Sequence, residues 1–76
     1  MTDFQITTDI RSSEENNCLY AEASEIGLEP GQVPNTLIYE GRAYRFCQPK
    51  TAANAEIYAW EYRDWLTLRR IVIWND

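Results

Sequence analysis

The chain contains no histidine and only two cysteines, Cys18 and Cys47. Histidine is the commonest general base and a very common metal ligand, so its absence removes the usual basis for acid–base catalysis and for a zinc site. A cysteine nucleophile would also lack its usual activating base. We therefore expect no catalytic residue, no bound metal, no cofactor and no enzymatic activity.

Long apolar stretches are also missing. No run approaches the roughly 20 residues that a membrane-spanning helix needs, and residues 1–5 lack the basic and apolar regions of a signal peptide. We expect a cytoplasmic protein in which Cys18 and Cys47 are small core thiols in a reducing environment. The sequence does not decide whether these two cysteines pair.

Positive charge is scarce, because seven Lys and Arg stand against twelve Asp and Glu, for a net charge of −5. Neutralising phosphates requires a surplus of basic side chains, so this balance argues against nucleic acid as a partner. The charge is uneven: residues 1–38 hold seven acidic side chains and one Arg, whereas residues 39–76 hold five acidic and six basic ones. Such a dipolar surface usually serves solubility, and it also suits contact with a basic partner.

Apolar and aromatic side chains are abundant. Hydrophobic residues make up 45% of the chain and ten residues are aromatic, which is too rich for a disordered protein. The length predicts one domain, residues 1–76, whose small core leaves a thin margin of stability. Domains of this size often gain stability from a partner subunit, so we expect a homodimer or docking on another protein.

Alternating apolar and polar residues predict short strands through most of the chain. The polar segments 11–17 and 48–55 are predicted as connections. The expected fold class is mostly β, with α+β as the alternative: an antiparallel meander of five to six short strands, curled into a roll or small open barrel. Strands are expected at residues 4–10, 18–21, 36–39, 42–47, 56–62 and 65–74.

One helical turn is predicted within residues 22–28. Gly27 suits the left-handed cap of such a turn, and Leu28 then folds back onto it. The next residues predict a type II turn with Pro30 and Gly31 at its central positions.

The two predicted hairpins differ in how well their registers are defined. In the first, Glu40-Gly41 suits a two-residue turn that places Leu37 opposite Tyr44. In the last, the register depends on the length of the loop. With a two-residue loop of Arg63-Asp64, Tyr58, Trp60 and Tyr62 lie on one face of the hairpin. Leu66 and Leu68 then lie on the other face.

A loop longer by one residue places those rings and leucines on one face and turns Glu61 to the solvent. We prefer this arrangement because it separates apolar from polar side chains better. The apolar face then holds Tyr58, Trp60, Tyr62, Leu66, Leu68, Val72 and Trp74, and the solvent face holds Glu61, Thr67 and Arg69.

Eight of the ten aromatic residues lie at or after Tyr39, interleaved with arginines. Aromatic strands beside arginine resemble a platform that stacks single-stranded nucleic acid. Tyr, Trp and Arg are also enriched at protein interfaces, and large rings also fill the cores of small β domains. The candidate binding residues are Tyr58, Trp60, Tyr62 and Arg69.

The leading hypothesis is a non-enzymatic protein-interaction module that buries an aromatic β surface rimmed by arginine. The alternative is a binder of single-stranded nucleic acid, which requires Tyr58, Trp60 and Tyr62 to be exposed and side by side. A further alternative is a small enzyme with paired carboxylates. Glu22 and Glu25 are three residues apart on the helical turn, a spacing that capping also explains.

Residues 22–34 resemble a segment found in small uncharacterised bacterial proteins, which reads E-A-S, G-L, P-G and P at the same spacings. A tyrosine-bearing hairpin and a closing Asn75-Asp76 extend the resemblance over most of residues 19–76. It implies a small autonomous bacterial domain without active-site residues and carries no known function. Short reading frames of this kind are often found on mobile genetic elements.

Overall fold

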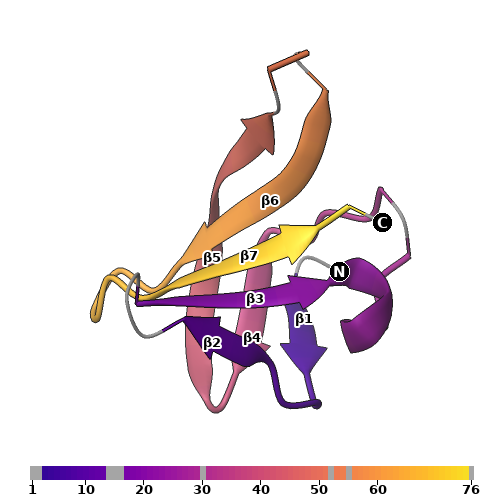
Figure 1. Ribbon diagram of the computed structural model, residues 1–76. Coiled ribbons are helices and arrows are strands. Elements are labelled where there is room, and N and C mark those ends of the chain that lie inside the picture. The colour runs from indigo at the N-terminus through magenta and orange to yellow at the C-terminus, as the bar shows by residue number, and fades with distance from the viewer. Residues whose placement is uncertain (1–2, 14–16, 30, 52, 55, 76) are drawn as a thin grey trace.

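The computed structural model describes residues 3–13, 17–29, 31–51, 53–54 and 56–75. Seven strands form one sheet in the order β1-β4-β5-β6-β7-β3-β2, which curls into a half-barrel (Figure 1). The elements are β1 (Asp3–Ile6), β2 (Arg11–Ser13), β3 (Cys18–Glu22), the 3-10 turn η1 (Ala23–Ile26), β4 (Thr36–Tyr39), β5 (Arg42–Thr51), β6 (Ile57–Arg63) and β7 (Arg70–Trp74).

The meander is the C-terminal half of the sheet, where β4, β5, β6 and β7 follow one another with antiparallel pairing. The N-terminal strands add to its two sides. Strand β1 pairs in parallel with β4, and β3 pairs in parallel with β7. The mostly β, curled fold with one helical turn is thus confirmed. The sheet is nevertheless mixed, and the predicted connection at 11–17 contains β2.

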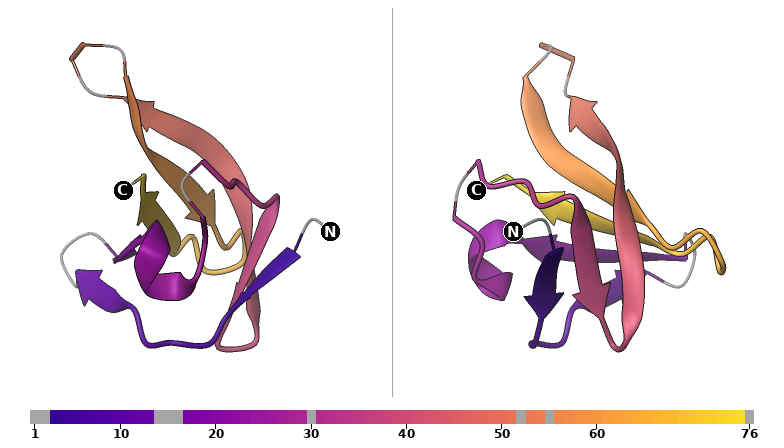
Figure 2. Two further views of the ribbon diagram at one scale, coloured as in Figure 1. Left: turned by 90° about the vertical axis from the view of Figure 1, so that its right-hand side faces the viewer. Right: turned by 180° about the vertical axis from the view of Figure 1, so that it is seen from behind.

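The main core lies inside the curl, and η1 covers its open side (Figure 2). Alternate residues of the strands point inward, so each strand supplies one face to this core. Its buried members are Ile6, Leu19, Ala21, Ala23, Ile26, Leu28, Leu37, Tyr39, Tyr44, Tyr62, Ile71 and Ile73. We call this side of the sheet the inner face and the opposite side the outer face.

The predicted helical turn is confirmed as η1. The Glu22 amide donates to Oε1 of Glu25 at 3.1 Å, which completes a capping box. Gly27 has a φ of 87° and ends the turn, and the Leu28 amide donates to the Ala23 carbonyl at 2.9 Å. The Glu25 carboxylate is thereby engaged in capping. In the predicted type II turn, Gly31 has the positive φ that this turn requires, 81°, and the Gln32 amide donates to the Glu29 carbonyl at 3.0 Å, whereas Pro30 lies outside the described residues.

The first hairpin has the predicted register, with Leu37 opposite Tyr44. Glu40 and Gly41 both have positive φ, 52° and 76°, as the two central residues of a type I′ turn require. Strand β5 then continues to Thr51 and projects with β6 beyond the rest of the sheet (Figure 1). The predicted connection at 48–55 is therefore wrong in its first half.

Neither register considered for the last hairpin is correct. Strand β7 begins only at Arg70, so that Tyr62 pairs with Ile71 and Glu61 pairs with Val72. Leu66 lies outside the sheet in a six-residue loop, residues 64–69. Glu61, which was expected in solvent, has an exposed fraction of 1%. The loop differs from the prediction because its backbone bonds back on itself, which withdraws it from the strand ladder.

Candidate functional site

The four predicted binding residues do not form one surface. Tyr62 belongs to the inner core, is 1% exposed and donates its hydroxyl to the Pro34 carbonyl at 2.7 Å. Trp60 packs half-buried against the same core. Tyr58 packs on the outer face, in a second cluster with Cys18, Ala59, Val72 and Tyr20. The three rings therefore do not lie exposed and side by side, as the nucleic-acid alternative requires.

Arg69 supports the core. Burial raises the pKa of the Tyr44 hydroxyl, and the charge of Arg69 and its hydrogen bond to that hydroxyl partly oppose the rise. The Arg69 carbonyl also accepts from the Asp64 amide at 2.8 Å. Arg69 thus ties the loop 64–69 to the interior.

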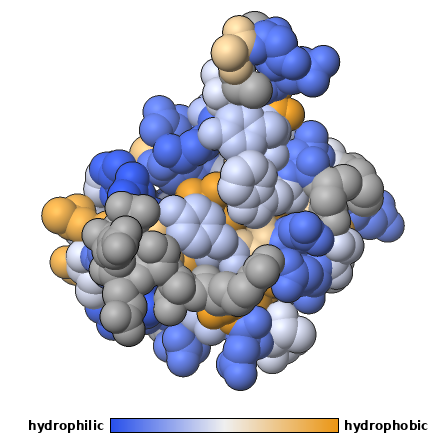
Figure 3. Space-filling model, viewed as in Figure 1, coloured by the Kyte–Doolittle hydropathy of each residue, from blue (hydrophilic) through white to orange (hydrophobic). Residues whose placement is uncertain are grey.

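That loop carries the most exposed large apolar side chains of the described chain. Leu66 is 90% exposed, Leu68 62% and Trp65 55%. We call these three residues the loop tip. The loop joins β6 to β7 at the left of Figure 1, and hydrophobic side chains gather at the same place in the space-filling view (Figure 3). Isolated exposed leucines are ordinary, but three large apolar residues within four positions form a patch.

Asp64 holds the loop in shape. Its carboxylate accepts from the Leu66 amide at 2.9 Å and from Arg42 Nε at 2.8 Å. Its carbonyl accepts from the Leu68 amide at 2.7 Å. The hydrogen bond from the Leu66 amide, with a smaller contribution from Arg42, lowers the pKa of the Asp64 carboxyl against the opposing effect of burial. The loop tip is thus displayed on a bonded frame.

Arginines surround the loop tip. A groove of about 450 Å³ separates the loop from the β4–β5 turn and is lined by Arg42, Arg45, Trp65 and Leu66, among others. The guanidinium of Arg63 lies 5.1 Å from the Trp65 ring centroid, within the range of a cation–π contact. Arg45 forms no ion pair with any residue that the structure describes.

A second group of charges occupies the outer face around Glu61. Oε1 of Glu61 lies 2.9 Å from Lys50 Nζ, as an ion pair outside hydrogen-bond geometry. The same oxygen lies 4.0 Å from Arg70 Nη1, and Oε2 lies 3.5 Å from Arg63 Nη2. Three cations from three different strands thus converge on one buried carboxylate.

The charges determine the ionisation of Glu61. Burial by itself raises the pKa of its carboxyl, but the Lys50 ammonium, with smaller contributions from Cys47 and Arg70, lowers that pKa below its ordinary value. Glu61 is therefore a stable anion at neutral pH. The sequence does not predict the role of Glu61, because alternation along residues 56–62 cannot show which face of a strand is buried. In the structure, both faces of β6 are buried.

Two irregularities in the β5–β6 pairing shape this face. Lys50 pairs with Ala59 and Thr51 pairs with Ile57, so Tyr58 is an extra residue on β6. Such a bulge changes the face toward which a side chain points. The Tyr58 ring accordingly lies on the outer face, with its centroid 5.2 Å from that of Trp74. Cys47 is the corresponding extra residue on β5.

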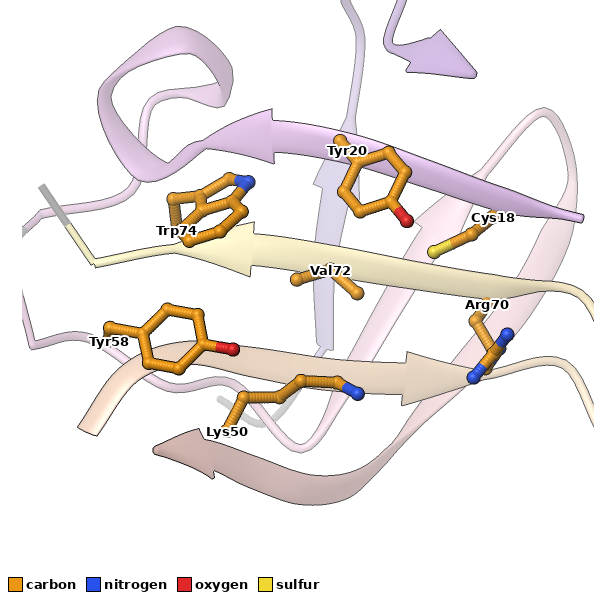
Figure 4. Close-up of a pocket in the computed structure, with 7 residues that line it drawn as sticks. All are labelled: Cys18, Tyr20, Lys50, Tyr58, Arg70, Val72 and Trp74. Atoms are coloured by element: carbon orange, nitrogen blue, oxygen red, sulfur yellow. The ribbon is translucent and has the colours of Figure 1, made fainter. Parts of the chain in front are cut away.

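The outer face is hollowed between these aromatic and charged side chains. A cavity of about 400 Å³ lies over β3, β7, β6 and β5, and we call it the outer cavity. Val72 lies between its aromatic and cationic ends (Figure 4). The residues that line it are Cys18, Tyr20, Lys50, Tyr58, Arg70, Val72 and Trp74.

The two cysteines are not bonded to each other. Cys18 is in β3 and Cys47 in β5, with β7 and β6 between them. Three strand spacings of about 4.8 Å separate them by roughly 14 Å, well beyond the reach of a disulfide. Cys18 is buried as expected, and Cys47 is half-buried and contributes to the lowered pKa of Glu61.

The chain matches no protein-family model, no curated protein sequence and no solved structure. Among the described residues, no helix is long and apolar enough to cross a membrane. Within the same residues, no group of three or more His, Cys, Asp or Glu side chains is placed to hold a metal ion.

Proposed function

We propose that this domain is a non-enzymatic protein-interaction module that docks through its loop tip. The observation that carries the proposal is the exposure of Trp65, Leu66 and Leu68 on a loop held by Asp64. Large apolar side chains in such a position cost solubility unless a partner covers them. The leading interpretation of the sequence thus keeps its function but moves the surface from the strands to the loop.

The loop frame favours binding because its conformation is set before a partner arrives. Three hydrogen bonds of Asp64 and one from Arg42 order the loop in the isolated domain. Association then loses less conformational entropy than it would with a disordered loop. Trp and Arg are also the residue types that most often dominate binding energy at interfaces.

The arginines define the kind of partner. Arg42, Arg45 and Arg63 flank the loop tip, and the groove beside it admits a side chain from the other molecule. A complementary surface is an apolar pocket rimmed by Asp or Glu. A symmetric dimer through the loop tip would bring these arginines against their own copies, so we assign the surface to a different protein.

The test is site-specific crosslinking in cells of the source organism. A benzophenone amino acid replaces Leu66, and the matched control carries it at Glu56, which is exposed at the β5–β6 end of the sheet. We expect a covalent adduct with one protein from position 66 alone, with the crosslink mapped beside Asp or Glu residues. The adduct should disappear in the variants Leu68→Ser and Arg45→Glu.

Three outcomes would overturn this assignment. One is the same adducts from positions 66 and 56, and another is a mapped crosslink without neighbouring acidic residues. The third is that the loop tip is covered by a second copy of the domain or by a membrane surface. Light scattering of the purified domain would show self-association that Leu66→Ser abolishes, and co-sedimentation with anionic lipid vesicles would show a membrane surface.

A further inference from the structure

We propose that the outer cavity binds a small aromatic anion, a planar ring that carries a phosphate or carboxylate group. This inference is independent of the loop tip, because the cavity lies over β3, β7 and β6, whereas the loop lies beyond the ends of β6 and β7 (Figures 1 and 4). It rests on how the cavity divides into a cationic end and an aromatic end.

The cationic end is formed by Lys50 and Arg70, whose charged groups point toward each other across the cavity (Figure 4). Glu61 lies between them, 2.9 Å from Lys50 Nζ and 4.0 Å from Arg70 Nη1. The buried carboxylate holds together two cations that would otherwise repel each other. Glu61 carries one negative charge, and Lys50 and Arg63 together carry two positive charges. These three side chains therefore have a net positive charge even before Arg70 is counted.

Among the described residues that line the cavity, the polar side chains at this end can all donate a hydrogen bond. Lys50 supplies an ammonium and Arg70 a guanidinium, and the hydroxyls of Tyr20 and Tyr58 point toward the same end (Figure 4). An ammonium and a guanidinium have no acceptor. The complementary ligand group therefore carries several acceptor oxygens and negative charge, as phosphate and carboxylate do.

The aromatic end is formed by Trp74 and the ring of Tyr58, and the ring of Tyr20 lies next to Val72, between the two ends (Figure 4). Trp74 and Tyr58 are tilted against each other by 35° at a centroid distance of 5.2 Å, and Trp74 remains exposed. The bulge at Tyr58 brings its ring to this face. A planar ring can lie against such a surface by stacking, as bases do on aromatic side chains.

The size of the cavity limits the ligand. Its volume of about 400 Å³ falls within the range of roughly 300–1,000 Å³ that is usual for small-molecule sites. A mononucleotide or a smaller aromatic acid fits this space. The outer cavity is partly open to the solvent, so a ligand can enter it from the surface.

The experiment is an NMR titration of the ¹⁵N-labelled domain. The probes are adenosine monophosphate, adenosine, inorganic phosphate and phenyl phosphate. We expect adenosine monophosphate to shift the amides of residues 58, 72 and 74 and to bind at least tenfold more tightly than adenosine or phosphate alone. Phenyl phosphate distinguishes a site for any aromatic phosphate from one that needs a larger ring.

Two variants and a matched control test the residues. Lys50→Gln removes the cavity ammonium, and Trp74→Leu removes the ring; each should weaken adenosine monophosphate binding at least tenfold. Arg45→Gln removes a positive charge from the same strand β5 outside the cavity and should leave the affinity within twofold. The amide spectrum of each variant shows that it is folded.

The inference fails if adenosine monophosphate and phenyl phosphate shift no cavity amide at millimolar concentration. It also fails if Arg45→Gln weakens binding as much as Lys50→Gln, because that result indicates only a general attraction of anions. If Lys50→Gln does not fold, Tyr58→Leu replaces it, with the same expected loss. In that case, unchanged binding in both Tyr58→Leu and Trp74→Leu rejects the site.

Discussion

Lys50 Nζ lies 2.9 Å from Oε1 of Glu61, a carboxylate on the neighbouring strand that is 1% exposed. A buried anion is costly unless cations compensate it, and here the compensation comes from strands β5, β6 and β7 together. The ion pairs of Glu61 therefore link the stability of the outer face to the arrangement of these three strands, and they make this face sensitive to single substitutions.

Glu61→Gln should destabilise the domain by about 2 kcal/mol, because it leaves three converging cations without their anion. The cost is below that of a fully buried pair, since the three cations are each about one-third exposed. Urea unfolding followed by tryptophan fluorescence measures the change. Glu56→Gln, at an exposed glutamate outside the cluster, should change stability by less than about 0.5 kcal/mol. Equal effects of the two substitutions would contradict the role of Glu61.

Acid should destabilise the protein through the same carboxylate and through Asp64. The pKa of each carboxyl is lowered in the folded state, so the stabilisation is complete above the unfolded pKa of about 4. It is then lost as the pH falls through the folded values. Circular dichroism during urea unfolding at pH 7, 5, 4 and 3 should show little change between pH 7 and 5 and a steep decrease below about pH 4. The variant carrying both Glu61→Gln and Asp64→Asn should show a shallower decrease.

Alkali should act through the buried tyrosines. Burial raises the pKa of the Tyr62 hydroxyl strongly, and burial also raises the pKa of Tyr44 against the opposing influence of Arg69. Because the folded pKa exceeds the unfolded value of about 10, this stability is complete below pH 10 and is lost as the pH rises through the folded value. Absorbance at 295 nm should show fewer than five tyrosines titrating before the protein unfolds.

The Tyr62 hydroxyl also makes a hydrogen bond that can be tested at neutral pH. Tyr62→Phe removes the donor to the Pro34 carbonyl, which lies 2.7 Å away, and should cost about 1 kcal/mol. Urea unfolding measures this loss. The substitution should also reduce the loss of stability above about pH 10. If the neutral-pH stability is unchanged, the bond to Pro34 contributes nothing to the fold.

Leu68 stores backbone strain in the loop. Its φ of 63° is unfavourable for a branched side chain, and its own side chain is mostly exposed. Leu68→Gly should therefore stabilise the domain by about 0.5–1 kcal/mol. Leu66→Gly, two residues earlier at a position without positive φ, should instead destabilise it by about 0.5 kcal/mol. Thermal unfolding of the two variants measures these changes. A loss of stability in Leu68→Gly would contradict the proposed backbone strain at Leu68.

Local chemistry made several elements predictable from residues close together in the chain. The Glu40-Gly41 turn and the register of the first hairpin follow from a two-residue loop whose backbone suits only such residues. The turn at η1 follows from Gly27 and the residue after it. Each of these features is complete within about ten residues, so no distant contact is needed to define it.

The candidate sites could not be predicted in the same way. The alternating leucines of the loop tip predict a strand, whereas the hydrogen bonds of Asp64 that keep them out of the sheet involve Arg42 on another hairpin. Glu61 was assigned to solvent because alternation shows that two faces differ and not which one is covered. The bulge at Tyr58 depends on the length of β5, which continues into a segment with a polar composition.

The sequence alone therefore defined a mostly β chain with its turns, its capped helical turn and its excess of acidic over basic charge. These properties depend on backbone preferences and on composition, which are local or additive. The burial of Glu61 among Lys50, Arg63 and Arg70 arose only when strands β5, β6 and β7 paired and both faces of the sheet were used. Electrostatic compensation and cavities depend on distances between residues far apart in the chain, and only the folded structure determines those distances.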